Sequence, residues 1–158
     1  MSADPENTLI MMLESGPVTI ALRPDLAPGH VARIKELARE GFYDGVVFHR
    51  VIPGFMAQGG DPTGTGAGGS DKANLMSEFS REPHVRGICS MARTSNPHSA
   101  NSQFFICFDD ATFLDNQYTV WGAVVEGMEH VDALPKGEPP RNPGKIVSMR
   151  VAADVDPA

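Results

Sequence analysis

FHRVIPGFMAQGGD, residues 48–61, is the most informative stretch of this sequence. Its first residues alternate as in a β-strand, so Arg50 shares one strand face with Phe48 and Ile52. The opposite face is apolar as well, and a strand with two apolar faces is typically covered on both sides. A charged side chain among such neighbours is costly unless it is paired or borders a wet cleft. Arg50 is therefore the first candidate for a functional residue.

Two further segments combine amide and bulky apolar side chains. The segment FMAQ, residues 55–58, follows a Pro-Gly turn directly after the arginine strand. The segment SQFFI, residues 102–106, repeats the pattern, because Gln103 and Phe105 share one face of a predicted strand. Taken singly, Phe55 and Met56 fit a packed core better than a pocket. Together with Arg50, they indicate the wall of a groove.

Short apolar runs bounded by turn residues occur along the whole chain and predict strands. Two of these runs flank a Ser-Gly turn and predict a hairpin over residues 8–13 and 17–22. Further strands are predicted over residues 46–52, 55–58, 88–92, 103–108, 119–125 and 146–152. Apolar residues at helical spacing predict one helix from Pro28 to a stop at Gly41, and a shorter helix is predicted over residues 128–134.

These elements favour an antiparallel, mostly β fold with two helices. A parallel α/β sheet would need a helix between most of its strands, and the sequence offers only two. Closure of the sheet into a barrel would remove its exposed edges.

Length and composition suit one compact domain. The chain has 158 residues, and we expect a single domain over residues 1–158 with a core at about 8–152 and short polar ends. The net charge of −7 disfavours nucleic acid and anionic membranes as partners. The 16 glycines and 13 prolines fit a fold with many turns.

The sequence predicts a cytoplasmic protein. No apolar run approaches the ~20 residues that cross a bilayer, and the first residues do not resemble a secretion signal. Cys89 and Cys107 lie in apolar runs without metal-binding or redox spacing, so we expect buried thiols in a reducing compartment.

We expect neither a cofactor nor a metal. Gly64, Gly66 and Gly69 satisfy a GxGxxG pattern, but a dinucleotide site needs a strand before the pattern and a helix after it. The flanking residues predict a loop instead. The five histidines stand singly, without the spacing of metal ligands.

Four segments carry a resemblance to a known family. FHRVIPGFMAQGGD with SMAR (90–93), NSQFFI (101–106) and FLDNQYTVWGAVVEGM (113–128) closely resembles the cyclophilins in their compact prokaryotic form, and the match runs from about Thr8 to Val151. The resemblance implies a closed eight-stranded antiparallel β-barrel capped by two α-helices. It also implies peptidyl-prolyl cis/trans isomerase activity that assists protein folding.

The resemblance also assigns roles to individual residues. Arg50 matches the catalytic arginine of the family, and His49, Phe55 and Gln58 match its neighbours at the catalytic centre. The residues that match the substrate-binding positions are Met56, Ala92, Arg93, Gln103, Phe105, Phe113, Leu114 and Tyr118.

Three of these residues depart from the best-known eukaryotic members. Phe113 replaces a tryptophan, Tyr118 a histidine and Arg93 an asparagine, and the missing tryptophan predicts weakened binding of cyclosporin. The expected partners are proline-containing peptides and unfolded protein chains, bound by a monomer. The alternative is a chaperone or scaffold that binds proline segments without significant catalysis.

Overall fold

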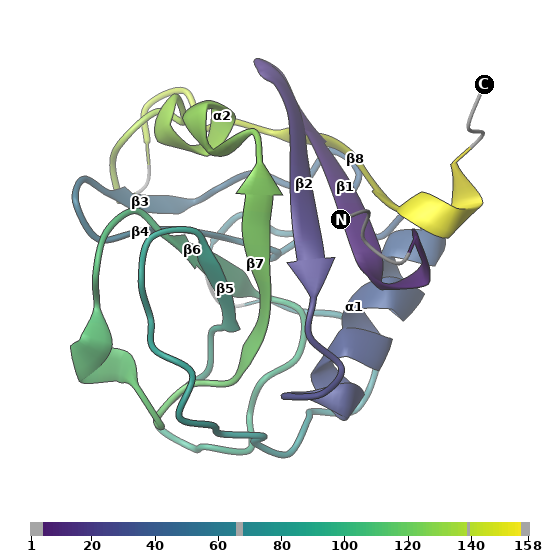
Figure 1. Ribbon diagram of the computed structural model, residues 1–158. Coiled ribbons are helices and arrows are strands. Elements are labelled where there is room, and N and C mark those ends of the chain that lie inside the picture. The colour runs from purple at the N-terminus through teal and green to yellow at the C-terminus, as the bar shows by residue number, and fades with distance from the viewer. Residues whose placement is uncertain (1–4, 66–67, 139, 156–158) are drawn as a thin grey trace.

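The computed structural model describes residues 5–65, 68–138 and 140–155, and these contain one eight-stranded sheet and two α-helices. The strands are β1 (Thr8–Leu13), β2 (Gly16–Leu22), β3 (Arg50–Ile52), β4 (Met56–Gly59), β5 (Ile88–Met91), β6 (Phe104–Cys107), β7 (Val120–Glu126) and β8 (Ile146–Val151). The helices α1 (Pro28–Arg39) and α2 (Met128–Asp132) lie at different ends of the sheet (Figure 1). Within the described ranges, no helix combines the length and the apolar character needed to cross a membrane.

The sheet is antiparallel, as predicted, but it forms an open half-barrel, and the expectation of a closed barrel was wrong. The strand order is β3-β4-β6-β5-β7-β2-β1-β8, with β3 and β8 at the edges. In the described residues no ladder joins these edges: residues 45–48, before β3, contact residues 144–146 through three backbone hydrogen bonds and one isolated bridge, between Val47 and Lys145. A continuous ladder needs regular strand on both sides, and only the last three residues of the strand expected over 46–52 are regular. Val46 and Phe48 are nevertheless buried, as the apolar pattern indicated.

Both faces of the central strands are covered by apolar side chains. The larger core cluster joins one face of the sheet, which we call the inner face, to α1 and includes Phe48, Phe104 and Trp121. A second cluster lies on the outer face and includes Met56 and Phe105. Strand side chains alternate between faces, so the consecutive residues Phe104 and Phe105 serve different clusters.

The two cysteines are buried and free, as predicted. Cys89 belongs to the inner cluster and Cys107 to the outer one, so they lie on opposite faces of the sheet. Burial raises the pKa of the Cys107 thiol to about 12 and also raises that of Cys89. Both thiols therefore stay protonated and unreactive near neutral pH.

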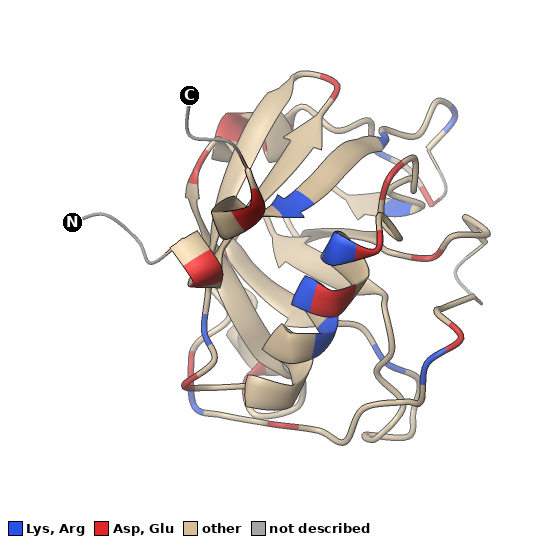
Figure 2. Cartoon of the chain, turned by 90° about the vertical axis from the view of Figure 1, so that its right-hand side faces the viewer, with Lys and Arg blue, Asp and Glu red and all other residues tan. Residues whose placement is uncertain are grey.

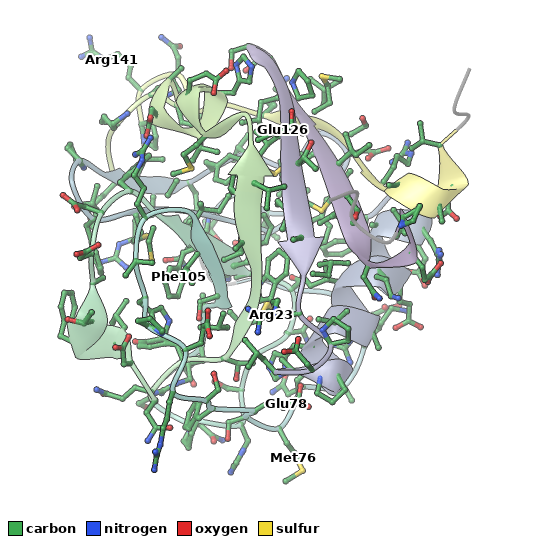
Figure 3. The ribbon with its side chains drawn as sticks, in the orientation of Figure 1. Arg23, Met76, Glu78, Phe105, Glu126 and Arg141 are labelled. Atoms are coloured by element: carbon green, nitrogen blue, oxygen red, sulfur yellow. The ribbon has the colours of Figure 1, made fainter. Side chains whose placement is uncertain are left out.

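The first turn of α1 is capped by a residue from a distant loop. Glu78 accepts hydrogen bonds from the backbone N–H of Gly29 at 3.1 Å and of His30 at 2.8 Å. Its Oε1 also lies 2.6 Å from Nδ1 of the buried His30 ring. Figure 3 shows Glu78 beneath the lower end of α1. A carboxylate suits this position because helix N-termini leave N–H groups unpaired and carry partial positive charge.

Replacing Glu78 with alanine should lower the free energy of unfolding by about 1–2 kcal/mol, because the helix loses its cap and the His30 ring loses its partner. Urea denaturation followed by circular dichroism measures the loss. Glu126→Ala is the matched control, since the Glu126 side chain is exposed and has no hydrogen bond among the described residues. Equal stability of the two variants would contradict the capping role.

Three buried histidines should make the stability depend on pH. Burial lowers the pKa of His30, His49 and His84, and for His30 and His84 it outweighs the raising effect of a neighbouring carboxylate. In the unfolded chain these groups titrate near pH ~6.5, so below that pH the unfolded state binds more protons than the folded state. We expect the free energy of unfolding to fall between about pH 7.5 and about pH 5.5, a window above the titration of the carboxylates. Urea titrations across this window measure it, and a flat profile would contradict the prediction.

Candidate active site

The candidate site lies on the outer face of the sheet, along one line of residues that are paired across neighbouring strands. The cross-strand register pairs Arg50 of β3 with Gln58 of β4, Gln58 with Phe105 of β6, and Phe105 with Ser90 of β5. Residues paired in this way place their side chains on the same face of the sheet. The register thus brings together residues that are far apart in the sequence.

A chain of hydrogen bonds orients the polar side chains of this site. Arg50 Nη1 donates to Gln58 Oε1 at 3.5 Å, and Gln58 Nε2 donates to Gln103 Oε1 at 2.9 Å. Gln103 Nε2 in turn donates to the Gly68 carbonyl at 2.9 Å. Both amides are therefore held in one orientation, with the Gln58 oxygen turned toward the arginine.

The other side of the Arg50 guanidinium contacts Glu138. Its Nε donates to Glu138 Oε1 at 3.1 Å. Val51 and Gly137 exchange two backbone hydrogen bonds of 2.8 Å, which places Glu138 opposite Arg50. The Nη2 group has no partner in the described part of the chain, so N–H donors remain for a ligand.

Beside the arginine lies a small pocket of about 140 Å³. It is lined by Arg50, Phe55, Met56, Gln58, Ala92, Arg93, Phe105, Leu114 and Tyr118. Met56 and Phe105 are nearly fully buried, so this part of the pocket belongs to the outer core cluster and is rigid. Six of the nine lining residues are thus apolar or aromatic, and two cations, the paired Arg50 and Arg93, stand beside them.

Phe105 is held from two sides. The Tyr118 ring meets it edge to face with the ring centroids 5.6 Å apart, and the His84 ring stacks on it at 6.1 Å. His84 is fully buried, with Nδ1 3.0 Å from Asp115 Oδ1 and Nε2 3.0 Å from Ser90 Oγ. Sequence reasoning missed this support, because a single histidine outside any motif gives no signal of its contacts.

Arg93 forms one edge of the pocket and is fixed by four contacts. Its guanidinium carbon lies 4.7 Å from the ring centroid of Tyr118 and 5.8 Å from that of Phe79. Nε donates to the Gln117 carbonyl and Nη1 to the Thr94 carbonyl, both at 2.9 Å. Two of the three departures from the eukaryotic pattern, Arg93 and Tyr118, therefore contact each other.

A larger polar groove of about 730 Å³ adjoins the pocket and shares Gln58, Ala92 and Arg93 with it. The remaining residues of its lining are Gly68, Gly69, Ser70, Asn74, Thr94, Asn96, Ser99, Asn101, Ser102 and Gln103. Gly68 and Gly69 place part of the glycine-rich segment at the groove, whereas Gly66 lies outside the described residues. The groove differs from the pocket in offering amide and hydroxyl groups rather than rings.

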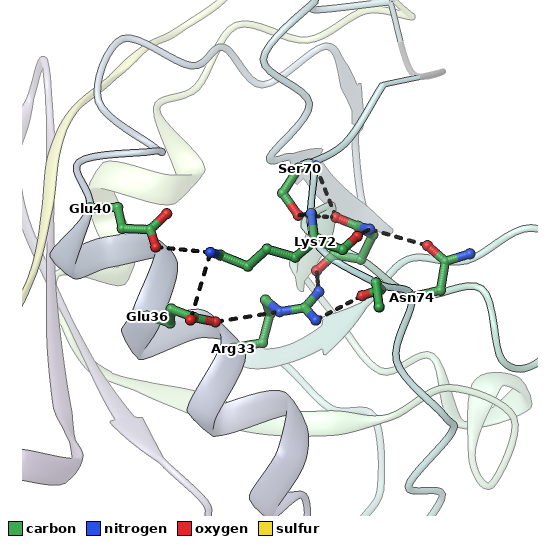
Figure 4. A network of polar contacts seen from close by, with 8 residues as sticks. Arg33, Glu36, Glu40, Ser70, Lys72 and Asn74 are labelled. Atoms are coloured by element: carbon green, nitrogen blue, oxygen red, sulfur yellow. Dashed lines mark hydrogen bonds and ion pairs between the residues drawn. The ribbon is translucent and has the colours of Figure 1, made fainter.

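Charged residues of α1, together with Glu40, which directly follows it, anchor one wall of the polar groove. Lys72 lies 2.9 Å from Glu40 and 3.6 Å from Glu36, and Arg33 donates to the Ala73 carbonyl at 2.7 Å (Figure 4). Figure 2 shows the acidic and basic positions side by side along α1. These contacts hold the loop that carries the groove residues Ser70 and Asn74 against the helix.

The structure brings together most of the site residues that the sequence suggested. All twelve except His49, Gln103 and Phe113 line the small pocket. Gln103 borders the polar groove, and His49 is buried without bordering either cavity. Phe113 is 66% exposed and does not line the pocket, but its ring lies beside that of the pocket residue Phe55, with a centroid distance of 5.6 Å. Sequence reasoning missed Glu138, since its position depends on one isolated bridge that leaves no periodicity.

Comparison with known proteins identifies the family of this chain. The family model for cyclophilin type peptidyl-prolyl cis-trans isomerases matches residues 8–151. A probable peptidyl-prolyl cis-trans isomerase of Brucella suis is 54% identical over 97% of this chain and 86% of its own length. A peptidyl-prolyl cis-trans isomerase of Synechococcus elongatus is 38% identical over 92% of this chain and 96% of its own.

Solved structures show the same fold. A cyclophilin from Hirschia baltica superposes with a TM-score of 0.92 at 34% identity, covering 99% of this chain and 78% of that one. A cyclophilin type isomerase of Cryptosporidium parvum, crystallised in the presence of the dipeptide Ala-Pro, has a TM-score of 0.84 at 28% identity, covering 91% and 98%. The matched family model, the curated relatives and the shared fold together show that the chain belongs to the cyclophilin-type peptidyl-prolyl cis-trans isomerases.

Proposed function

We propose that Arg50 accelerates rotation about X-Pro bonds by donating a hydrogen bond to the prolyl nitrogen while the small pocket holds the proline ring. The observation that carries this proposal is a guanidinium fixed on two sides, with free N–H donors, at the rim of a rigid apolar pocket. The substrates are proline-containing segments of peptides and unfolded proteins. Because uncatalysed X-Pro isomerisation limits the folding of many chains, the activity would assist folding.

The chemistry of the peptide bond explains why one donor is useful. Rotation breaks amide resonance and has a barrier of ~18–20 kcal/mol. In the planar ground state the nitrogen lone pair is delocalised into the carbonyl, whereas in the twisted transition state it is localised and accepts a hydrogen bond. A donor aimed at this nitrogen therefore binds the transition state more strongly than the substrate, which is the condition for catalysis.

One hydrogen bond does not supply the whole effect. Shortening ~100 s to about a millisecond needs roughly 7 kcal/mol, whereas a hydrogen bond to a charged group contributes about 1.5–3 kcal/mol. Fixed positioning supplies the remainder, because a preorganised donor needs no reorientation during the reaction. In this site, Glu138 and Gln58 hold the donor, and the buried Phe105 holds the ring.

Exchange NMR on a short peptide with one X-Pro bond distinguishes catalysis from mere binding. At a protein concentration far below that of the peptide, the isomerase increases the cis/trans exchange rate of the whole peptide pool. A scaffold that only binds proline segments leaves this rate unchanged, and that result would overturn the proposal.

A further inference from the structure

We infer that Arg93 makes the enzyme prefer substrates with an acidic side chain on the N-terminal side of the proline. The inference rests on the proposed function, since it assumes that the proline ring occupies the small pocket. It follows from three features of Arg93: its charge has no counterion, its position is fixed, and it stands where the pocket meets the polar groove.

The charge on Arg93 has no carboxylate partner. Arg50 and Arg93 are the charged residues that line the pocket and the groove, and Arg50 is paired with Glu138. In the described part of the chain, no carboxylate lies within ion-pair distance of Arg93, and no Asp or Glu lines either cavity. On a protein with a net charge of −7, this surface is therefore locally positive.

Arg93 is also prevented from turning away from the groove. Its guanidinium stacks on Tyr118 and lies near Phe79, and two of its nitrogens donate to the backbone carbonyls of Gln117 and Thr94. These acceptors are neutral, so they orient the group without cancelling its charge. Its Nη2 has no hydrogen-bond partner among the described residues and is available to a carboxylate.

The geometry of the reaction indicates which side of the substrate meets this charge. The prolyl nitrogen must approach Arg50, and this nitrogen is the atom that joins proline to the preceding residue. Gln58, which accepts from Arg50, borders the polar groove as well as the pocket. Ala92 and Arg93 also line both cavities, so in the proposed binding mode the residues before proline leave the pocket across them and enter the groove, whose amides and hydroxyls also suit an anionic side chain.

The expected preference is moderate, because the site is open to solvent. An exposed ion pair changes an equilibrium by about threefold to fivefold, and salt screens it. We therefore expect kcat/KM to be about threefold to fivefold higher for a peptide with Glu before proline than for the Gln peptide. A Lys peptide should be slower than the Gln peptide by a similar factor, because like charges repel.

Exchange NMR on peptides with Glu, Gln or Lys at each of the two positions before proline tests the inference. Arg93→Gln should reduce the Glu/Gln ratio to about one, and Arg93→Lys should restore the preference, since the charge is retained. Lys145→Gln is the matched control: it removes one charge at a surface that shares no residue with the pocket or the groove, and it should keep the wild-type ratio. In the wild type, the ratio should shrink toward one in about 1 M NaCl.

Each result of this experiment either supports or overturns the inference or the proposed function. Equal kcat/KM for the Glu and Gln peptides with intact isomerase activity would overturn the inference and leave the proposed function standing. A preference that persists in Arg93→Gln would also overturn it, because the charge of another group would then be responsible. If no peptide is isomerised at all, the proposed function itself fails, together with the inference that rests on it.

Discussion

The Arg50→Ala variant should lose about 10-fold to 100-fold in kcat/KM for X-Pro isomerisation, which corresponds to the loss of one charge-assisted hydrogen bond in the transition state. Its free energy of unfolding should change by less than about 1 kcal/mol, because the ion pair with Glu138 is solvent-exposed. Activity is measured by exchange NMR and stability by urea denaturation. The kcat/KM of Arg50→Lys should stay well below that of the wild type. A single ammonium cannot reproduce the fixed fork geometry in which the guanidinium donates to Glu138 and Gln58 and still donates to the substrate.

A control variant separates the role of Arg50 from a general effect of charge. Arg141 is also an exposed arginine, has no side-chain partner among the described residues, and lies away from Phe105 in Figure 3. Arg141→Ala removes the same charge and should retain full activity. Near-native turnover in Arg50→Ala, or an equal loss in both variants, would contradict the role assigned to Arg50.

The Phe104→Ala variant should lose about 3–5 kcal/mol of unfolding free energy, the largest effect on stability expected from a single change here. Phe104 is fully buried in the inner cluster, and its ring meets those of Tyr43, Phe48 and Trp121 edge to face at centroid distances of 5.5, 6.0 and 5.8 Å. Its removal leaves a cavity among large rings that cannot collapse to fill it. Urea denaturation or calorimetry measures the loss.

The adjacent residue provides the comparison for Phe104. Phe105 lies on the outer face and lines the pocket, so Phe105→Ala should raise KM for proline peptides strongly in molecules that remain folded. Phe104→Ala should keep a near-native KM at a temperature where it is folded. If both variants lost peptide affinity equally, the separation of the two clusters by strand alternation would not hold.

The strands and helices could largely be predicted from local patterns, whereas the closure of the sheet could not. The hairpin over residues 8–22, α1 and most later strands follow apolar periodicity and turn residues, which act over a few positions. Whether β3 and β8 join depends on the regularity of residues 46–49, which are buried except for the partly exposed Val47 but do not form a regular strand. A pattern of buried residues reports burial, not the hydrogen-bonding path of the backbone.

In the candidate site, too, the residues marked by their sequence neighbours could be predicted, whereas contacts between distant segments could not. Arg50 stood out because a charge among apolar strand neighbours needs a partner, and the structure supplies two, Gln58 and Glu138. Nothing near residue 138 indicates that it meets β3, because that contact depends on one isolated bridge between Val51 and Gly137. The contact between Arg93 and Tyr118 was equally invisible, since the two residues come from loops 25 positions apart in the sequence.

Exchange NMR on peptide-saturated samples of wild type and Arg50→Ala tests most directly whether Arg50 acts on the transition state. One sample reports both the fraction of bound peptide and the cis/trans exchange rate in the bound state. We predict nearly equal binding of the peptide by both proteins and an exchange rate at least about tenfold lower in the variant. Equal exchange rates at equal occupancy would contradict this account.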